Sequence, residues 1–361
     1  MRPVSPLPSR KTALEYPCTE AVAPGAAQQV APGIYWMRMP LPFALEHINL
    51  WLLADGRGWT VVDCGFASDA ARAAWQQIFE RHFGGLPLTR LIVTHHHPDH
   101  IGLGGWLCEK YGLVPWLTPA EYLLAHAYYH RIGGTDHATL LAFLTRHGLA
   151  RERLARANWR EDHYRRGVPL LPQAFRSLGH GDELEIGGHG WRVIVGRGHA
   201  PQHVALHCAA LGVLISGDML LPRISTNVSV WPMAPEDDPL GDFLASLEDF
   251  SALDAGTLVL PSHGLPFRGV RERIAELERH HRARLERLSA GCEQPATAAE
   301  LLPHLFQREF DDYQLIFAMG ETVAHLNYLM RRGVLIRSTG PDGVHRFVRR
   351  VAVAAAPERT S

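Results

Sequence analysis

The chain is predicted to fold as an α/β protein, because strand-like and helix-like segments alternate along it. Apolar runs with strand character come first, at residues 34–37, 48–53 and 59–62. A turn at 54–58, which contains Asp and Gly, predicts a hairpin between the last two of these strands. An amphipathic helix at 68–83, a strand at 91–94 and a helix at 104–111 follow, an order typical of layered α/β packing.

A mostly helical insertion of about three helices is predicted over residues 118–167, where apolar residues recur at helical spacing between Arg and His. Thr118, Pro119 and Glu121 predict its start, with Thr118 as the N-cap of a capping box that Glu121 completes. A further helix is expected at 239–253. The strands that resume after the insertion are expected at residues 182–186, 191–195, 204–208, 213–215 and 258–260.

A compact C-terminal unit is predicted after a long charged helix at 271–288. Thr297 and Glu300 form a second predicted capping box at the start of this unit. Its elements are expected to be helices at 301–306, 312–317 and 321–332, then strands at 334–337 and 344–348 around a turn at 340–343. Three helices followed by a two-stranded wing indicate a small winged-helix domain.

The length of 361 residues suits one large domain and one small domain. The predicted organisation is an N-terminal arm at 1–29, a large domain at 30–270, a linker helix plus winged-helix domain at 271–350, and a tail at 351–361. The 36 basic residues nearly balance the 37 acidic ones, so overall charge gives no argument for nucleic acid or an anionic membrane surface.

The five cysteines are widely separated and never form a C-x-x-C pair, which predicts free thiols in a reducing compartment. No stretch of the chain has the 18 or more consecutive apolar residues that a spanning helix needs. The N-terminal segment also lacks the apolar block of a signal peptide. A cytoplasmic protein without a membrane partner is therefore expected.

The run Thr-His-His-His-Pro-Asp-His at 94–100 directly follows an apolar strand. Side chains alternate along a strand, so His95 and His97 are expected on the same side of the backbone. Asp99 and His100 then lie in the turn, within reach of a second ion. Nitrogen and oxygen donors without thiolates suit zinc, iron or manganese, so the run predicts a metal site.

A chance cluster is the alternative for this run, because the chain contains 22 His. A structural account gives no reason, however, for an apolar strand to end in four such polar residues. By the same alternation His96 is expected to point away from its neighbours and to have a structural role.

Three more candidate ligands stand after apolar strands: His199 after 193–195, Asp218 after 213–215 and His263 after 258–260. Small residues beside each of them let the backbone bend sharply and approach an ion closely. Four strands that end at one edge of a sandwich would form a pocket rather than a surface patch.

In these residues the chain resembles the metallo-β-lactamase superfamily over about residues 33–268. The matching motifs, in the family's order, are Asp63-Cys64-Gly65, His95-x-His97-x-Asp99-His100, Gly198-His199, Ser216-Gly217-Asp218 and Ser262-His263-Gly264. The resemblance implies an αββα sandwich that holds two divalent ions, with zinc as the first choice and iron or manganese as alternatives. It implies one site of His95, His97 and His199, a second of Asp99, His100 and His263, and a bridging Asp218.

Other residues are expected to support these ligands. Asp63 is given a structural or ligand-supporting role, and His203, which resembles a further family histidine, is expected to support a ligand rather than to be one. His47, near the first hairpin, is also expected close to the site. Arg223 and Asn227 lie in the segment after Asp218, where they could bind a substrate carboxylate or phosphate, or simply stabilise the loop.

The implied chemistry is hydrolysis by a hydroxide shared between the two ions, with Asp99 and Asp218 as catalytic residues. The expected substrate is a small thioester, ester or lactone, and the helical insertion would cover its acyl group. The alternative is a phosphodiesterase or endoribonuclease. An iron-dependent persulfide dioxygenase or a β-lactamase is less favoured, the latter because the family's true β-lactamases usually replace His100 or Asp218.

The basic residues of the predicted winged helix bear on the choice of partner. Arg331 and Arg332 stand at the end of its third helix, and Arg337, Arg346, Arg349 and Arg350 lie on its hairpin. Such residues could contact nucleic acid. The favoured interpretation is that this unit packs against the sandwich or a second subunit, so the expected partner is a small molecule. A homodimer is left open.

Overall fold

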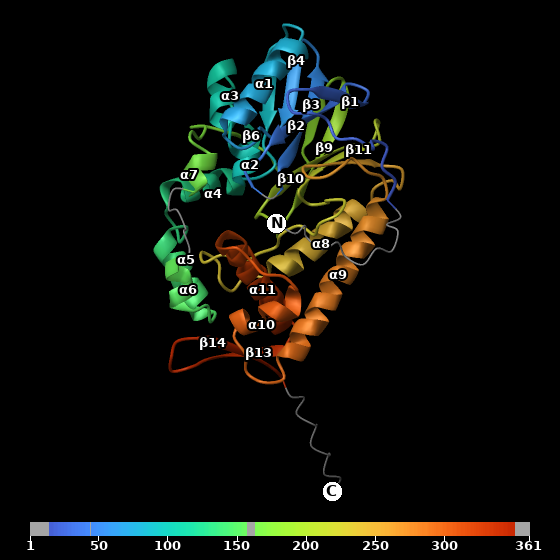
Figure 1. Cartoon of the computed structure of the whole chain (residues 1–361). Helices are drawn as coiled ribbons and strands as arrows, with labels where there is room; N and C mark the ends of the chain where they lie inside the picture. Colours follow the sequence, from blue (N-terminus) through green and yellow to red (C-terminus); the bar gives the residue numbers. More distant parts are fainter. Residues whose placement is uncertain (1–13, 44, 157–162, 351–361) are drawn as a thin grey trace. The chain divides into compact units, whose positions relative to one another are not determined.

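The structure, a computed structural model, describes residues 14–43, 45–156 and 163–350 (Figure 1). The chain divides into two compact units. The first unit comprises Met1–Ile132, Glu161–Thr226 and Phe243–Glu278, and the second comprises Gly133–Arg160, Asn227–Asp242 and Arg279–Ser361. The predicted tail at 351–361 and the first thirteen residues of the predicted arm lie outside the described residues.

Two sheets form the frame of the first unit. The seven-stranded sheet runs in the order β1 (Ala27–Ala31), β2 (Ile34–Pro40), β3 (His47–Asp55), β4 (Gly58–Val62), β5 (Leu88–Ile92), β6 (Trp116–Leu117) and β7 (Arg176–Ser177). The five-stranded sheet runs in the order β12 (Leu258–Pro261), β11 (Val213–Gly217), β10 (His203–Cys208), β9 (His189–Gly196) and β8 (Glu183–Ile186). The first sheet is antiparallel from β1 to β4 and parallel from β4 to β7.

Alternation of side chains along the strands builds the layers of this unit. In β2, Ile34 and Trp36 join a core that also contains residues of the second sheet, whereas Met37 and Met39 join a separate core on the other face. That outer core is completed by the helices α1 (Asp69–Arg81) and α3 (Gly104–Tyr111), which cover the first sheet (Figure 1). The two sheets therefore pack face to face beneath a helical layer.

The second sheet also carries a helix, α8 (Pro239–Ser251), which belongs to the first unit from Phe243 onward. This part of α8 buries Phe243, Leu247 and Phe250, and its Ser246 hydroxyl accepts a hydrogen bond from the Arg197 N–H just after β9. The mixed α/β sandwich predicted from the sequence is confirmed. Its strands end where the candidate ligands begin, since β5, β9, β11 and β12 directly precede the four ligand-bearing loops.

The described residues of the predicted N-terminal arm contact the rest of the first unit. Leu14 is buried, and the backbones of Glu15 and Arg268 exchange two hydrogen bonds. Residues 27–31 form β1 and pair with β2, although the sequence there is Ala- and Gln-rich. Residues 27–31 have a low propensity for strands, and the hydrogen bonds to β2 hold them in the extended conformation.

The predicted helical insertion is divided between the two units. Its helices are α4 (Pro119–His130), α5 (His137–Arg146), α6 (Arg151–Arg156) and α7 (His163–Gly167). Helices α4 and α7 belong to the first unit, and α5 and α6 belong to the second. Leu140 and Leu144 of α5 join the core of the second unit, whereas Ala125 of α4 joins a core of the first.

The second unit holds the C-terminal helices and hairpin. After α9 (Val270–Gly291), which spans both units, its elements are α10 (Ala298–Leu305), α11 (Asp312–Arg331), β13 (Leu335–Thr339) and β14 (His345–Arg349). The Thr297–Glu300 capping box and the hairpin are confirmed. The two predicted helices at 312–317 and 321–332 are one helix, so the winged-helix prediction is not confirmed over the described residues.

Gly320 explains why the helical pattern looked interrupted. It lies in the middle of α11, where a Cβ atom would stand 2.9 Å from the Cβ of Ser229. The Val230 N–H also donates a hydrogen bond to the Gly320 carbonyl at 3.1 Å. Glycine is therefore required for close approach of another segment, and it does not end the helix.

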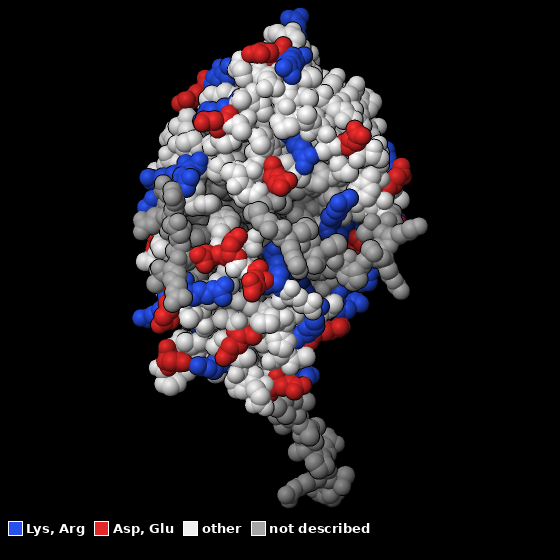
Figure 2. Space-filling view, in the orientation of Figure 1, with Lys and Arg blue, Asp and Glu red and all other residues white. Residues whose placement is uncertain are grey.

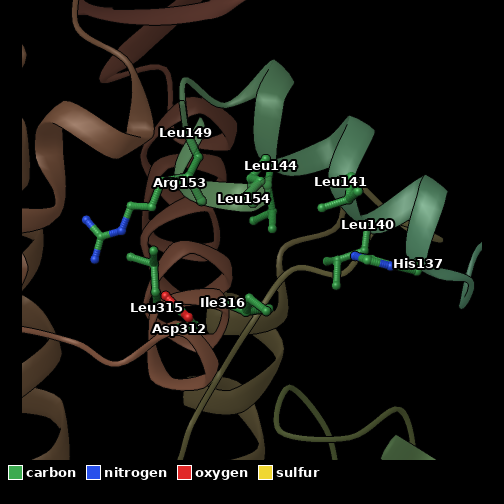
Figure 3. A pocket seen from close by; sticks show the side chains of 10 residues that line it. All are labelled: His137, Leu140, Leu141, Leu144, Leu149, Arg153, Leu154, Asp312, Leu315 and Ile316. Carbon is green, nitrogen blue, oxygen red and sulfur yellow. The ribbon is translucent and has the colours of Figure 1, made fainter. Parts of the chain in front are cut away.

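A hollow opens at one end of the core of the second unit, between α5, α6 and the start of α11 (Figure 3). Leucines of α5 face Leu315 and Ile316 of α11 across it, and Arg153 and Asp312 also line it. Most of these apolar residues belong to the core of the unit. None of the lining residues belongs to the candidate metal ligands, so the hollow is a feature of packing.

All five cysteines lie among the described residues and are free thiols. Among the helices that the structure describes, none combines the length and the apolar character needed to cross a membrane.

Acid sensitivity is expected from His147, at the end of α5. Burial, with smaller contributions from His345 and nearby arginines, lowers its pKa to about 4. Because the unfolded side chain titrates near its ordinary value, stability is lost as the pH falls from about 6.5 towards 4. The ring packs against Phe143 and Phe347, so His147→Phe keeps the contact without the titration.

Between pH 7 and pH 4.5, the free energy of unfolding should therefore fall by about 2 to 3 kcal/mol more in wild type than in His147→Phe. Urea denaturation of both proteins at the two pH values measures the difference. An identical pH dependence in the two proteins would show that His147 does not titrate on unfolding.

Candidate metal centre

Seven side chains from four loops of the first unit gather into two adjacent groups. One group contains His95, His97, His199 and Asp218, and the other contains Asp99, His100 and His263. Within each group the candidate ligand atoms all lie within 4.8 Å of one another. The structure therefore brings together all seven residues that the sequence proposed as metal ligands.

The first group is built from imidazole nitrogens and one carboxylate oxygen. His95 Nε2 lies 2.9 Å from His97 Nδ1 and 3.2 Å from His199 Nε2. Asp218 Oδ2 lies 3.3 Å from His199 Nε2. Atoms from three strand-end loops, after β5, β9 and β11, thus lie close together.

The second group adjoins the first through Asp218. His263 Nε2 lies 3.5 Å from Asp99 Oδ2 and also 3.5 Å from Asp218 Oδ1. His100 Nε2 lies 3.7 Å from Asp99 Oδ2 and 3.6 Å from Asp218 Oδ2. The two oxygens of Asp218 therefore face both groups, as a shared ligand would.

The donor atoms fit divalent cations. His100 Nε2 and Asp218 Oδ1 are buried polar atoms without a hydrogen-bond partner, and such atoms are costly unless something binds them. Burial and neighbouring histidines lower the pKa of His95 and of His97 far below its usual range, so their nitrogens offer lone pairs. Neutral imidazoles and carboxylates gathered in this way indicate divalent metal ions.

Local backbone geometry aims these side chains. After β5, His97 stands at the N-cap of the short helix α2 (Pro98–Ile101), and this turn carries Asp99 and His100. At the end of β11, Gly217 has a φ of +54°, and a Cβ there would stand 2.3 Å from the His203 ring. Only glycine allows the sharp bend that presents Asp218 beside His203.

Asp63 holds His100 in the orientation that the second group requires. Its Oδ2 lies 2.7 Å from His100 Nδ1, and its Oδ1 accepts a hydrogen bond from the Thr94 N–H at 2.8 Å. With Nδ1–H donated to Asp63, His100 directs Nε2 at the group. Asp63 also has a φ of +62°, a conformation unusual for a residue other than glycine and often found at functional sites.

The carboxylates around His100 affect its protonation. Burial alone lowers the pKa of His100, but Asp63, Asp99 and Asp218 outweigh burial and raise it well above its usual range. A cation at Nε2 would replace the proton that these carboxylates favour.

His203 and His47 each form a hydrogen bond with a candidate ligand, His203 with Asp218 and His47 with His263. His203 Nε2 accepts a hydrogen bond from the Asp218 N–H at 3.1 Å, and burial together with His199 lowers its pKa to about 4. The His47 carbonyl lies 2.9 Å from His263 Nδ1, and His47 Nε2 accepts from the Gly264 N–H. Both residues therefore contact candidate ligands and stand outside the two groups.

Asn49 is a supporting residue that the sequence analysis missed. It is fully buried, and its side-chain amide donates to the carbonyls of Pro261 and Gly264 at 2.8 Å each. These bonds hold the loop that carries His263. The sequence did contain a signal for this role, because Asn49 is a polar residue within an otherwise apolar strand.

Glu121 was also missed, because its position suggested a helix cap. The Thr118 side chain makes no capping hydrogen bond, and its hydroxyl donates to the Gln202 carbonyl. Glu121 accepts hydrogen bonds from His96 and Gln202 instead of capping the helix. The predicted capping box at 118–121 is therefore wrong, since tertiary partners outcompete the local ones.

His96 points away from the two groups, as expected, and stacks on Tyr128 with the rings 5.5 Å apart. Arg223 is exposed in the first unit. Asn227 belongs to the second unit, where its Oδ1 accepts a hydrogen bond from the Ser229 hydroxyl. The assignment of Arg223 and Asn227 to the substrate stays a prediction.

Comparison with known proteins agrees with this arrangement. Residues 45–263 match the model of the metallo-β-lactamase superfamily, and residues 285–350 match that of a metallo-β-lactamase-like C-terminal domain. A crystal structure of a β-lactamase domain protein from Burkholderia ambifaria is 48% identical, with a TM-score of 0.86, over 93% of this chain and 97% of that chain.

Two curated relatives are informative. The "probable metallo-hydrolase YqjP" of Bacillus subtilis is 28% identical over 81% of this chain and 91% of its own length. A hydroxyacylglutathione hydrolase of Xylella fastidiosa is 38% identical over 104 residues, which are 28% of this chain and 36% of that protein. With the His/Asp groups and the sandwich, these matches show that the chain belongs to the metallo-β-lactamase superfamily as a metallo-hydrolase.

Proposed function

We propose that this protein hydrolyses a small thioester, with esters and lactones as related substrates, at a centre of two divalent ions. The observation that carries the proposal is Asp218, whose two oxygens face both groups of ligands. The local similarity to a hydroxyacylglutathione hydrolase supports a thioester as the substrate class. Zinc suits the nitrogen and oxygen donors, and iron and manganese are the alternatives.

The residues divide into ligands and residues that orient ligands. The proposed ligands are His95, His97 and His199 at one ion, Asp99, His100 and His263 at the other, and Asp218 at both. When bound, divalent ions lower the pKa of water towards about 7 and polarise the carbonyl of a substrate. Asp63, His203 and His47 hold the ligands in place, so that little reorganisation is needed during the reaction.

The second unit favours a small-molecule substrate over nucleic acid. Arg332 pairs with Asp238, Arg337 with Glu236, and Arg346 with Asp342, so these cations are already partnered. On the face shown in Figure 2, basic and acidic residues are interspersed. A surface that binds nucleic acid would instead gather unpaired positive charge.

An assay of the zinc-loaded protein against acyl-glutathione thioesters and a single-stranded RNA tests this proposal. Thioester hydrolysis with kcat/KM above about 10⁴ M⁻¹ s⁻¹ is expected, because typical enzymes reach that value with their own substrates. RNA cleavage without thioester turnover would contradict the proposal and favour a nuclease. Oxygen consumption by a protein with a single iron would favour a dioxygenase.

A further inference from the structure

A buried carboxylate outside the ligand set ties together the two loops of the first ligand group. Glu121 is fully buried on α4, although acidic residues are seldom buried without partners. Its two oxygens point to different loops: Oε2 to the loop after β5, and Oε1 to the loop after β9. The ligand groups do not include Glu121.

On the first loop, Glu121 binds the residue between two proposed ligands. Its Oε2 accepts from the His96 N–H at 3.0 Å and lies 2.6 Å from His96 Nδ1. Because His96 stands between His95 and His97, the peptide that Glu121 holds sets the direction of both neighbouring side chains. The Tyr164 hydroxyl, from α7, donates to the His96 carbonyl at 2.6 Å and fixes the other side of the same residue.

On the second loop, α4 binds both polar groups of one residue. Glu121 Oε1 accepts from the Gln202 N–H at 2.7 Å, and the Thr118 hydroxyl donates to the Gln202 carbonyl at 3.0 Å. Gln202 stands three residues after His199 and directly before His203, which accepts from the Asp218 N–H. Through His96, the first turn of α4 is therefore linked to His95 and His97. Through the loop that carries Gln202 and His203, it is linked to His199 and Asp218.

We propose that Glu121 is a positioning residue for the first metal ion, because one rigid carboxylate spaces the loop of His95 and His97 from the loop of His199. The inference rests on the proposed metal centre. Glu121 touches neither ion nor substrate and acts through His96 and Gln202. Residues that orient metal ligands in this way typically contribute a 10- to 100-fold increase in metal affinity.

The variant Glu121→Gln tests the proposal, because it keeps the size of the side chain. An amide offers one acceptor oxygen, so it can satisfy either His96 or Gln202, and its NH₂ group meets an N–H donor at the other. Zinc affinity is measured by competition with a chromophoric chelator on the full-length protein, and the visible spectrum of the Co²⁺-loaded protein reports ligand geometry.

For Glu121→Gln, about 10- to 100-fold weaker binding of one zinc ion and an altered Co²⁺ spectrum are expected. His126→Phe is the control on the same helix, since the His126 ring contacts the Pro172 carbonyl and neither ligand loop. It should keep the wild-type affinity and spectrum, even if its melting temperature falls. Wild-type affinity and spectrum in Glu121→Gln, with only a lower melting temperature, would overturn the proposal.

A second pair of variants covers the case in which Glu121→Gln does not fold. Tyr164→Phe removes the hydrogen bond to the His96 carbonyl, and Tyr129→Phe removes an equivalent bond to the Pro169 carbonyl. Zinc affinity should fall severalfold in Tyr164→Phe alone, and equal affinities in the pair would overturn the proposal. If the wild type binds no metal, the proposed function fails as well. If wild type and Glu121→Gln each bind two zinc ions with equal affinity, only the positioning role is rejected.

Discussion

Replacement of Asp218 by alanine should reduce kcat/KM for the thioester by roughly 10³- to 10⁴-fold, because a bound ion contributes several kcal/mol to stabilising the transition state. The change removes the oxygen near His199 and the oxygen near His263 together. Metal analysis of the purified variant should give fewer than two ions per chain. Activity and metal content should therefore fall together.

The fold should survive this substitution. The main-chain contacts of Asp218, to His203 and from the Thr226 hydroxyl, do not depend on its side chain. Without metal, Asp218 still pairs with three buried histidines, so the metal-free variant should melt lower than metal-free wild type but still unfold cooperatively. Added zinc should raise the melting temperature of wild type more than that of the variant, because ligands stabilise the state that binds them.

Asp249→Ala, at an exposed position on α8, serves as the control and should keep full activity and both ions. Full thioester turnover by a metal-verified Asp218→Ala protein would contradict the shared-ligand role. Loss of activity with both ions retained would instead place Asp218 in catalysis without a role in binding the metal.

The positions of the candidate ligands could be predicted because they depend on local rules. A strand that ends in His-x-His directs both imidazoles to one side, and the structure places His95 and His97 together. His199, Asp218 and His263 each follow an apolar strand, and those strands end at one edge of the sandwich. Spacing within a motif and its position after a strand are both visible in the sequence.

The supporting residues were less accessible, because local and tertiary hydrogen bonds compete for the same side chains. Thr118 and Glu121 have the spacing of a capping box, and so do Thr297 and Glu300. Only the second pair caps its helix, whereas the first pair binds Gln202 and His96. Giving up the cap costs about 1 kcal/mol, and the loops of the metal centre receive the hydrogen bonds instead.

The division into units could not be predicted either, because periodicity identifies an apolar face but not its partner. Leu140 and Leu144 follow the same helical pattern as the apolar residues of α4, yet they join the core of the second unit. Gly320 led to a wrong prediction for a similar reason, since it stands between the two helices that were predicted there. Its role depends on Ser229, which lies 91 positions away in the sequence and is invisible to local pattern.

Asp63→Asn should weaken zinc binding by about 10- to 100-fold and lower activity with it. Asparagine tolerates the positive φ of this position, so the backbone should remain as it is. The amide can still accept from the Thr94 N–H, but its NH₂ group would then face His100 Nδ1. His100 would accept that hydrogen bond and carry its proton on Nε2, the atom directed at the second group.

The consequence of the wrong tautomer is specific to one ion. Zinc titration with a competing chelator should show weaker binding at the second group, to which His100 belongs, in Asp63→Asn. Binding at the other site should be retained, since His95, His97 and His199 keep their geometry. Asp55→Asn is the matched control, because Asp55 lies at the end of β3 opposite His47. Its contacts are with Thr60, Arg90 and Gly187, none of which is a candidate ligand. Equal zinc affinities in Asp63→Asn and Asp55→Asn would mean that Asp63 stabilises the Thr94 loop without setting the tautomer of His100, whereas selective loss of one ion would assign the orientation of His100 to this single carboxylate.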